Sequence, residues 1–307
     1  MTFELFIEQL LNGVQFGFML FLMSAGLTLI FGVMGLINLA HGSFYMVGAF
    51  SAAAVAAAFG SFWLSLLASL IFASLAGVLV ELLVIRRLYN RDHLDQVLAT
   101  FALILLFSES VRWIFGAYPL YLDVPEILSG TIQIIGGIYY SKYRLFIIMV
   151  GLLLCIFLFF LIGKTNLGVQ IRAGQHDREM ISALGVDISK LYTFLFGIGA
   201  ALAGLAGGLV GTIQSVEVGM GEPVLILAFV VIVIGGIGSI KGALVASLIV
   251  GCVDTMGRFL VPWCLTTITD PSTAMSIGSA IASMLIYILM AIVLIIRPTG
   301  LFGKGLT

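Results

Sequence analysis

The chain is a succession of apolar runs, each about 20 residues long, joined by short polar connections. A helix of about 20 apolar residues crosses the hydrocarbon core of a bilayer and satisfies its own backbone hydrogen bonds there. The pattern therefore predicts an all-α, polytopic transmembrane helix bundle with almost no room for sheet. We expect nine spans; eight or ten also fit, because the seventh run is short and the first two lie close together. The expected spans are residues 11–34, 40–59, 62–85, 96–115, 145–163, 191–213, 223–238, 242–261 and 276–296.

Composition excludes a water-soluble fold. Hydrophobic residues make up 61% of the 307 residues and charged residues only 9%, whereas a soluble domain carries about 25% charged residues. Since no polar stretch is long enough to fold by itself, residues 1–307 are expected to form a single membrane domain. The net charge of −1 gives no reason to expect a nucleic-acid partner. The odd number of cysteines and the lack of CxxC spacing argue against a disulfide framework or a metal site. They are Cys155, Cys252 and Cys264.

The distribution of Lys and Arg predicts the orientation. With nine spans and the N-terminus outside, ten of the 14 Lys and Arg residues fall in cytoplasmic connections, in agreement with the positive-inside rule, and the C-terminus is cytoplasmic. Residues 1–10 contain Glu4 and Glu8 but lack the basic region of a signal peptide, so we expect them to be retained as a short amphipathic helix at the interface. The ten cytoplasmic cations are Arg86, Arg87, Arg91, Lys164, Arg172, Arg178, Lys190, Lys241, Arg297 and Lys304.

The longest polar interruption is residues 164–190, on the predicted cytoplasmic face. Its pattern predicts a helix from Gln170 to Leu184 that ends at Gly185 as a C-terminal cap. Charged residues share this helix with apolar ones such as Met180. A short amphipathic helix parallel to the membrane can insert into a groove on a cytoplasmic partner, and an ordinary solvated loop is the alternative.

Polar side chains inside an apolar span mark candidate functional positions, because a charge at a helix centre costs about 2.5–3.5 kcal/mol. Asn38 and His41 lie at the break between the first two spans. They either line a path or gate, or cap helix ends where lipid cannot satisfy the backbone.

A second polar group lies between the sixth and seventh predicted spans. It consists of Gln214, Glu217 and Glu222. Gly219 and Gly221 permit an irregular backbone there, which suits a site that lines a cavity. A solvated loop is the alternative.

Other features are predicted to be structural. Glu109 and Arg112 on the fourth span, and Asp254 and Arg258 on the eighth, have spacings that place each pair on one helix face. The small residues from Gly197 to Gly211 predict close helix packing, either within the bundle or at a subunit interface.

The sequence contains no nucleotide-binding or hydrolase motif. Gly163-Lys164-Thr165 looks like the end of a P-loop, but Leu158 stands where that motif requires its first glycine. There is no G-x-S-x-G elbow and no H-E-x-x-H. We therefore expect a chain that is not an enzyme; if ATP drives its action, another chain hydrolyses it.

Motifs spread along the chain carry a family resemblance. The segment 26–49 contains Asn-Leu-Ala-His-Gly, 168–207 contains Gly-x-x-x-Arg-Ala and Ala-Leu-Gly, 222–242 contains Gly-Gly-Ile-Gly-Ser-Ile, and 297–303 reads RPTGLFG. In this order they resemble the permease subunits of branched-chain amino acid ABC importers (LivH type) over nearly the whole chain. Two departures are Ser43, where an acidic residue is often found, and Lys241, where Pro is often found.

The resemblance implies a permease that moves amino acids, branched-chain ones in the first place, into the cytoplasm as part of an ATP-binding cassette importer. Relatives of this kind also carry other amino acids, urea or amides. It implies two cytoplasmic ATPase subunits that hold ATP and Mg, a second homologous permease subunit, an extracytoplasmic solute-binding protein and a bacterial cytoplasmic (inner) membrane. No cofactor or metal is expected on this chain. The alternative is a secondary transporter driven by an ion gradient.

Residues 170–187 are then the coupling helix that docks into an ATPase. The implied ATPase-coupling residues are Arg172, Gln175, Asp177, Arg178, Glu179, Ser182, Ala183, Leu184 and Gly185. The candidate translocation-pathway residues are Asn38, His41, Ser43, Gln214, Glu217 and Glu222, the last three forming an outer vestibule that suits a zwitterionic amino acid.

Overall fold

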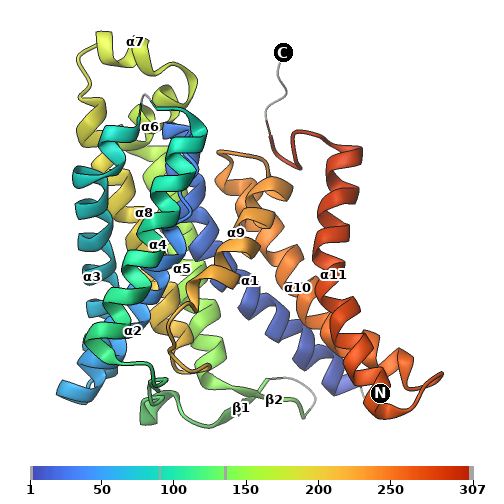
Figure 1. The fold of residues 1–307 in the computed structure, drawn as a ribbon. Helices are drawn as coiled ribbons and strands as arrows, with labels where there is room; N and C mark the ends of the chain where they lie inside the picture. Colours follow the sequence, from blue (N-terminus) through green and yellow to red (C-terminus); the bar gives the residue numbers. More distant parts are fainter. Residues whose placement is uncertain (1–2, 90, 135–136, 304–307) are drawn as a thin grey trace. The chain divides into compact units, whose positions relative to one another are not determined.

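A computed structural model describes residues 3–89, 91–134 and 137–303. The described residues form eleven α-helices, two short 3-10 helices and one two-stranded antiparallel sheet (Figure 1). In chain order the elements are α1 (Phe3–Met34), α2 (His41–Phe59), α3 (Phe62–Leu83), η1 (Ile85–Leu88), α4 (His93–Phe115), η2 (Glu126–Leu128), β1 (Thr131–Gln133), β2 (Tyr139–Ser141), α5 (Lys142–Lys164), α6 (Asn166–His176), α7 (Arg178–Ala183), α8 (Ile188–Val210), α9 (Gly221–Gly235), α10 (Ile240–Leu265) and α11 (Pro271–Ile296).

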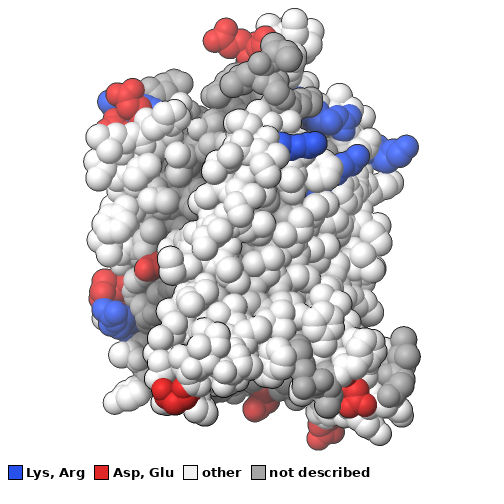
Figure 2. Space-filling view, turned by 90° about the vertical axis from the view of Figure 1, so that its right-hand side faces the viewer, with Lys and Arg blue, Asp and Glu red and all other residues white. Residues whose placement is uncertain are grey.

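The predicted helical membrane bundle is confirmed. Eight helices are long and apolar enough to cross a bilayer, namely α1 to α5, α8, α10 and α11. The seventh predicted span corresponds to α9, whose 15 residues fall short of that length. On the face drawn in Figure 2, most of the surface carries no charged side chain, as contact with lipid requires.

One boundary prediction was wrong. Residues 3–10, expected as a separate interfacial helix, form the first turns of α1, which continues unbroken to Met34. The segment contains Leu, Glu and Gln, which favour helix, and contains no proline that would end it. Residues 1–2 lie outside the described part of the chain.

The chain divides into two compact units, each built from separate segments. Unit 1 comprises residues 1–21, 126–153 and 229–307, and unit 2 comprises residues 22–125 and 154–228. The single-domain assignment made from the sequence stays a prediction.

In unit 2, helices α2, α3 and α8 pack closely along one another (Figure 1). Glycines make this possible, because a Cβ atom at position 204 would lie 2.2 Å from Ala73 Cβ, and one at position 207 would lie 2.0 Å from the Tyr45 carbonyl oxygen. The small residues of α8 therefore serve packing inside this chain's own bundle, which is one of the two roles that the sequence left open.

In unit 1, α10 packs on α11, and a Cβ atom at Gly278 would lie 2.7 Å from Pro262 Cα. The chain beyond α11 closes the end of α9. The Leu301 N–H donates to the Ile234 carbonyl at 2.8 Å, and the Phe302 N–H donates to Gly235 at 3.0 Å. Two carbonyls that end the short helix are thereby satisfied by a distant part of the sequence.

Candidate functional site

The polar segment 164–190 forms two helices, α6 and α7, so the prediction of one helix from Gln170 to Leu184 was wrong. The break falls at Asp177, whose backbone is extended (φ −151°, ψ 104°). Its carboxylate accepts hydrogen bonds from the backbone N–H groups of Glu179 (3.0 Å) and Met180 (2.9 Å). Aspartate is a preferred N-cap, so this local bond ends one helix and starts the next.

The predicted stop of this segment is confirmed at Gly185. Its φ is +87°, a left-handed conformation that glycine adopts without steric cost. The Gly185 N–H donates to the Ser182 carbonyl (3.0 Å) and the Val186 N–H donates to Ile181 (3.3 Å), which satisfies the last carbonyls of α7.

Two large apolar side chains on α7 and its C-cap face outward. Met180 is 65% exposed and Leu184 is 78% exposed, whereas Ile171 and Ile181 are buried. The other predicted coupling residues that the structure describes are also exposed, namely Arg172, Gln175, Asp177, Glu179, Ser182, Ala183 and Gly185. The side chain of Arg178 lies outside the described residues. An exposed apolar pair among polar groups is a surface suited to a protein partner.

Arg172 has a structural task that the sequence did not indicate. Its guanidinium donates to the Ile162 carbonyl near the end of α5. A Cβ atom at Gly168 would also lie 2.1 Å from that oxygen, so α6 turns tightly under the end of α5. Helix-terminal carbonyls are open acceptors, and Arg172 satisfies one of them.

The break between α1 and α2 lies within unit 2. After this break the chain runs back along α1, so that α2 starts beside the middle of that helix. Val33, near the end of α1, lies beside α6, because a Cβ atom at Gly174 would lie 3.4 Å from Val33 Cγ1. The His41 Nε2 atom, in contrast, lies 3.3 Å from the Met23 carbonyl oxygen. Ten residues of helix separate Met23 from Val33, or about 15 Å, so α2 starts well inside the span.

Asn38 and His41 are both completely buried at this break. Asn38 Oδ1 accepts the Ala40 N–H at 3.1 Å, which supports the helix-end capping interpretation. That interpretation leaves Asn38 Nδ2 and His41 Nδ1 with no hydrogen-bond partner among the described residues. Buried polar atoms without partners are uncommon and call for an explanation such as a bound ligand or water. In each side chain, one polar atom has a partner within the fold and the other has none among the described residues.

The start of α9 meets the start of α2. A Cβ atom at Gly221 would lie 1.9 Å from the Gly42 carbonyl oxygen, so the two backbones are in direct contact. This contact brings His41 and Ser43, on either side of Gly42, close to the chain position of Glu222. Helix N-termini carry a partial positive charge, and broken helices of this kind form solute sites in transporters.

Of the remaining predicted pathway residues, Gln214 and Glu217 lie on the connection before α9, and Glu222 lies in the first turn of α9. Gln214, Glu217 and Glu222 are exposed, and Gly219 has a φ of +87°, so the predicted irregular backbone is present. This connection pairs with the connection that follows α4. The Leu120 N–H donates to the Val216 carbonyl at 2.9 Å, and the Val216 N–H donates to the Leu120 carbonyl at 2.8 Å.

Both predicted structural ion pairs are present. Arg112 Nη1 lies 2.5 Å from Glu109 Oε1 on the surface, and Arg258 Nε lies 2.9 Å from Asp254 Oδ1. Among the described residues, no group of three or more His, Cys, Asp and Glu could hold a metal ion.

Sequence reasoning missed a buried charge network at the end of α3. Glu81 is completely buried and accepts hydrogen bonds from Arg86, Tyr89 and Thr193, which joins α3 and η1 to α8. The Glu81 bonds raise the pKa of Arg86, and burial together with Glu81 raises the pKa of Tyr89 above its usual value. A lone Glu near the end of an apolar run, five residues before an Arg, is the signal that could have revealed it.

Comparison with known proteins agrees with these features. A family model described as "Branched-chain amino acid transport system / permease component" matches residues 9–294. The chain is 29% identical to the high-affinity branched-chain amino acid transport system permease protein BraD of Pseudomonas aeruginosa, over 97% of this chain and 96% of that protein.

It is also 27% identical to the LivH permease proteins of Escherichia coli and Salmonella typhimurium, over 98% of this chain and 97% of each relative. No solved structure gives a significant match. Because the family model covers nearly the whole chain, and the fold is the helical membrane bundle that the apolar runs predicted, this protein belongs to the family of branched-chain amino acid transport permease components.

Proposed function

We propose that this chain is the permease subunit of an ATP-binding cassette importer that moves branched-chain amino acids into the cytoplasm. The observation that carries the proposal is the likeness to permease proteins of branched-chain amino acid transport systems over 96–97% of their length. Because the sequence contains no P-loop, the proposal assigns the binding of ATP and Mg to partner subunits.

The α6–α7 segment is the proposed docking surface for two cytoplasmic ATPase subunits, one on each permease. Exposed Met180 and Leu184 provide apolar contacts, and Glu179 provides a charge beside them. Contacts of α6 and α7 with α8 give ATP-driven movement a route into a membrane-spanning helix. A second, homologous permease subunit and an extracytoplasmic solute-binding protein complete the proposed assembly.

The charge distribution in unit 2 supports the part of the proposed orientation that places residues 84–92 and 164–190 in the cytoplasm of a bacterial cell. Seven of the eight Lys and Arg residues of this unit lie within residues 84–92 and 164–190. The contact of Arg86 with Thr193 joins these two regions at one end of the unit. Short cytoplasmic connections of inner-membrane proteins carry such an excess of cations.

The proposed solute pathway passes the meeting point of α2 and α9. Asn38 Nδ2 and His41 Nδ1 are buried and unpartnered among the described residues, and therefore offer hydrogen bonds to a solute. The exposed carboxylate of Glu222 follows Gly221, at the same contact. An amino acid carries both charges, so its carboxylate suits the helix N-termini and its ammonium suits Glu222.

Co-purification tests the proposal. The chain is expressed with the products of its neighbouring genes, and ATPase subunits are expected to remain bound after gentle solubilisation. Leu184→Glu is expected to release them while the permease stays folded, because this side chain is 78% exposed. Ile268→Glu is the matched control, since Ile268 is equally apolar and 81% exposed in a connection predicted to lie outside. ATPases that bind both variants equally, or do not bind the native chain, would reject the docking surface.

A carrier driven by an ion gradient is the second candidate, favoured by the start of α2 inside the span. Uptake that survives removal of ATP but stops with an ionophore would establish it.

A further inference from the structure

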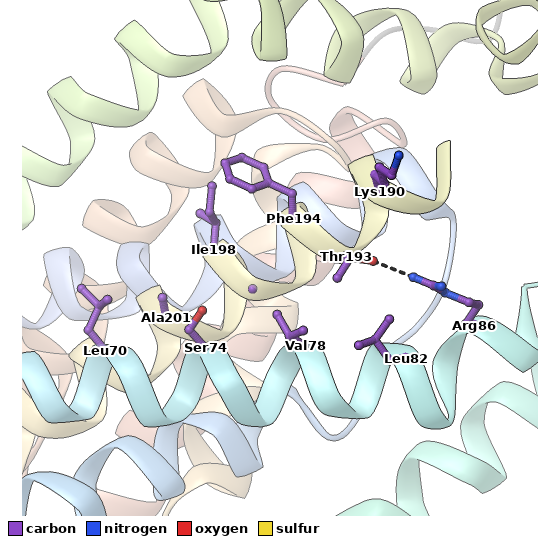
Figure 3. Close-up of a pocket in the computed structure, with 11 residues that line it drawn as sticks. Leu70, Ser74, Val78, Leu82, Arg86, Lys190, Thr193, Phe194, Ile198 and Ala201 are labelled. Carbon is purple, nitrogen blue, oxygen red and sulfur yellow. Dashed lines mark hydrogen bonds between the residues drawn. The ribbon is translucent and has the colours of Figure 1, made fainter. Parts of the chain in front are cut away.

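An open groove of about 620 Å³ follows the packed helices α3 and α8 within unit 2 (Figure 3). On α3 its lining residues recur every four positions, at Leu70, Ser74, Val78 and Leu82, and so form one helix face. On α8 the lining includes Phe194, Ile198 and Ala201. Apart from the Ser74 hydroxyl, these side chains are apolar and would make van der Waals contacts with a ligand.

Gly197 gives the groove its depth. A Cβ atom at this position would lie 3.1 Å from Val78 Cγ2 and 3.4 Å from Ser74 Oγ. Because glycine has no side chain, the two helices approach closely here and leave a channel between the larger residues of their outer faces.

The charged groups of the lining are gathered at one end of the groove. Figure 3 places Arg86, Thr193 and Lys190 at this end, whereas Leu70 and Ala201 lie toward the other. Arg86 Nη2 donates to Thr193 Oγ1 at 2.8 Å. Glu81, which is completely buried, binds Nε and Nη2 of the same guanidinium and fixes its position.

Both cations keep capacity for a ligand, although each has an acidic neighbour. Arg86 uses Nε and Nη2 for its bonds within the described residues, which leaves Nη1, and its side chain is 39% exposed. The Lys190 ammonium lies 3.2 Å from Asp187 Oδ2, but its side chain is 86% exposed and an ammonium has three donors.

The length of the groove matches one leaflet of a bilayer. Leu82 and Leu70 are twelve residues apart on α3, which corresponds to about 18 Å of helix. Half of a hydrocarbon core is about 15 Å thick. When the cations lie at the headgroup level, the apolar part of the groove therefore extends through the acyl-chain region of that leaflet.

We propose that this groove binds an anionic phospholipid, with an acyl chain along α3 and α8 and the phosphate at Arg86 and Lys190. Basic side chains at the membrane surface attract anionic lipids, and guanidinium and ammonium groups form strong hydrogen bonds with phosphate oxygens. A transmembrane helix of a partner protein is the other occupant, and the cross-linking arm of the experiment below distinguishes it from a lipid. The proposal depends on α3 and α8 crossing a membrane and does not depend on the transported solute.

Native mass spectrometry of the purified full chain tests this site. The chain is exchanged into detergent that contains equal amounts of phosphatidylglycerol and phosphatidylcholine, and the retained lipids are weighed on the protein. We expect one phosphatidylglycerol per chain in preference to phosphatidylcholine. Lys190→Ala is expected to lower its retention about fivefold, from the loss of one surface cation. Ala201→Phe fills the groove and is expected to abolish retention of both lipids.

Lys164→Ala is the matched control, since Lys164 is an exposed cation of unit 2 that does not line the groove, and it is expected to retain the lipid like the native chain. The melting temperature of each variant shows that it is folded. Equal retention by native, Lys190→Ala and Ala201→Phe chains would overturn the proposal. So would displacement of the lipid by inorganic phosphate alone, or cross-linking of Ala201→Cys to another protein chain irrespective of lipid.

Discussion

The backbones of Gly42 and Gly221 touch, since a Cβ atom at position 221 would come within 1.9 Å of the Gly42 carbonyl oxygen. Each glycine lies in the first turn of its helix, α2 or α9. The contact therefore fixes two helix starts against each other inside unit 2. The side chains next to these glycines are the ones that we place on the solute pathway.

Gly221→Ala is expected to lower the free energy of unfolding by about 1–3 kcal/mol, the usual cost of overpacking, because the methyl group would meet backbone that cannot move aside. Gly163→Ala is the control, since a Cβ atom there meets nothing within 4 Å in helix α5. Alanine is favoured over glycine in a helix by about 0.5–1 kcal/mol, so this variant should be as stable as the native chain or more so. Unfolding in mixed micelles measures both variants. Equal stability of the two would refute the close contact.

Asn38→Asp separates the two functions of the Asn38 side chain. The carboxyl group keeps an oxygen that accepts the Ala40 N–H but lacks the unpartnered Nδ2 donor. If that donor binds the carboxylate of the solute, its loss removes a hydrogen bond worth about 1.5–3 kcal/mol, and uptake falls about 10- to 100-fold. The measurement is ATP-driven uptake of labelled leucine into proteoliposomes that contain the whole importer. Ser65→Ala, a buried hydroxyl that bonds only its own helix backbone among the described residues, should transport normally. Normal uptake by Asn38→Asp would remove Asn38 from the pathway.

Glu81→Ala is expected to destabilise the protein strongly, because Arg86, Tyr89 and Thr193 lose their common acceptor. Glu109→Ala removes the acid of a surface ion pair and should change the melting temperature little. The melting temperatures of the two variants are compared by thermal unfolding, with the labelling of cysteines as the signal of unfolding. A melting temperature of Glu81→Ala close to that of Glu109→Ala would mean that the buried network contributes nothing.

Asp270 predicts a pH dependence at the start of α11. Its carboxylate accepts a hydrogen bond from the Ser272 hydroxyl at 2.6 Å and one from the Thr273 N–H at 3.0 Å, and these bonds lower its pKa to about 2. Since the folded pKa lies below the unfolded value of about 3.9, the cap stabilises the helix above pH 4. Its contribution is lost as the pH falls toward 2. The protection factor of the first turn of α11, which is its hydrogen exchange relative to the intrinsic rate at the same pH, should therefore fall on acidification in the native chain but not in Asp270→Asn. The same pH dependence in both would contradict this account.

The sequence predicted the helices well where one physical requirement dominates. A lipid-spanning helix must be apolar for about 20 residues, and that requirement alone placed the spans of α3 and α5. It placed α9 less well, because 15 residues fall short of a span. The break at Asp177 was missed because a single side-chain cap outweighs the helical pattern around it.

Candidate residues were predicted by type, and their relationships were not. Asn38 and His41 stood out as polar groups in an apolar context, but their unpartnered atoms depend on the position of Met23 and on the depth of the break. The contact of Gly42 with Gly221 joins distant parts of the chain through atoms that all residues possess. No pattern of side chains along a sequence reports such a backbone contact.

The hydrogen bonds from Leu301 and Phe302 to the end of α9 impose an order on the folding of the chain during its synthesis. A ribosome makes α9 well before it makes these two residues. Until then the Ile234 and Gly235 carbonyls at the end of α9 lack these donors. The final closure of unit 1 must therefore follow the insertion of α10 and α11, and a chain interrupted before Leu301 would leave α9 open to quality-control proteases.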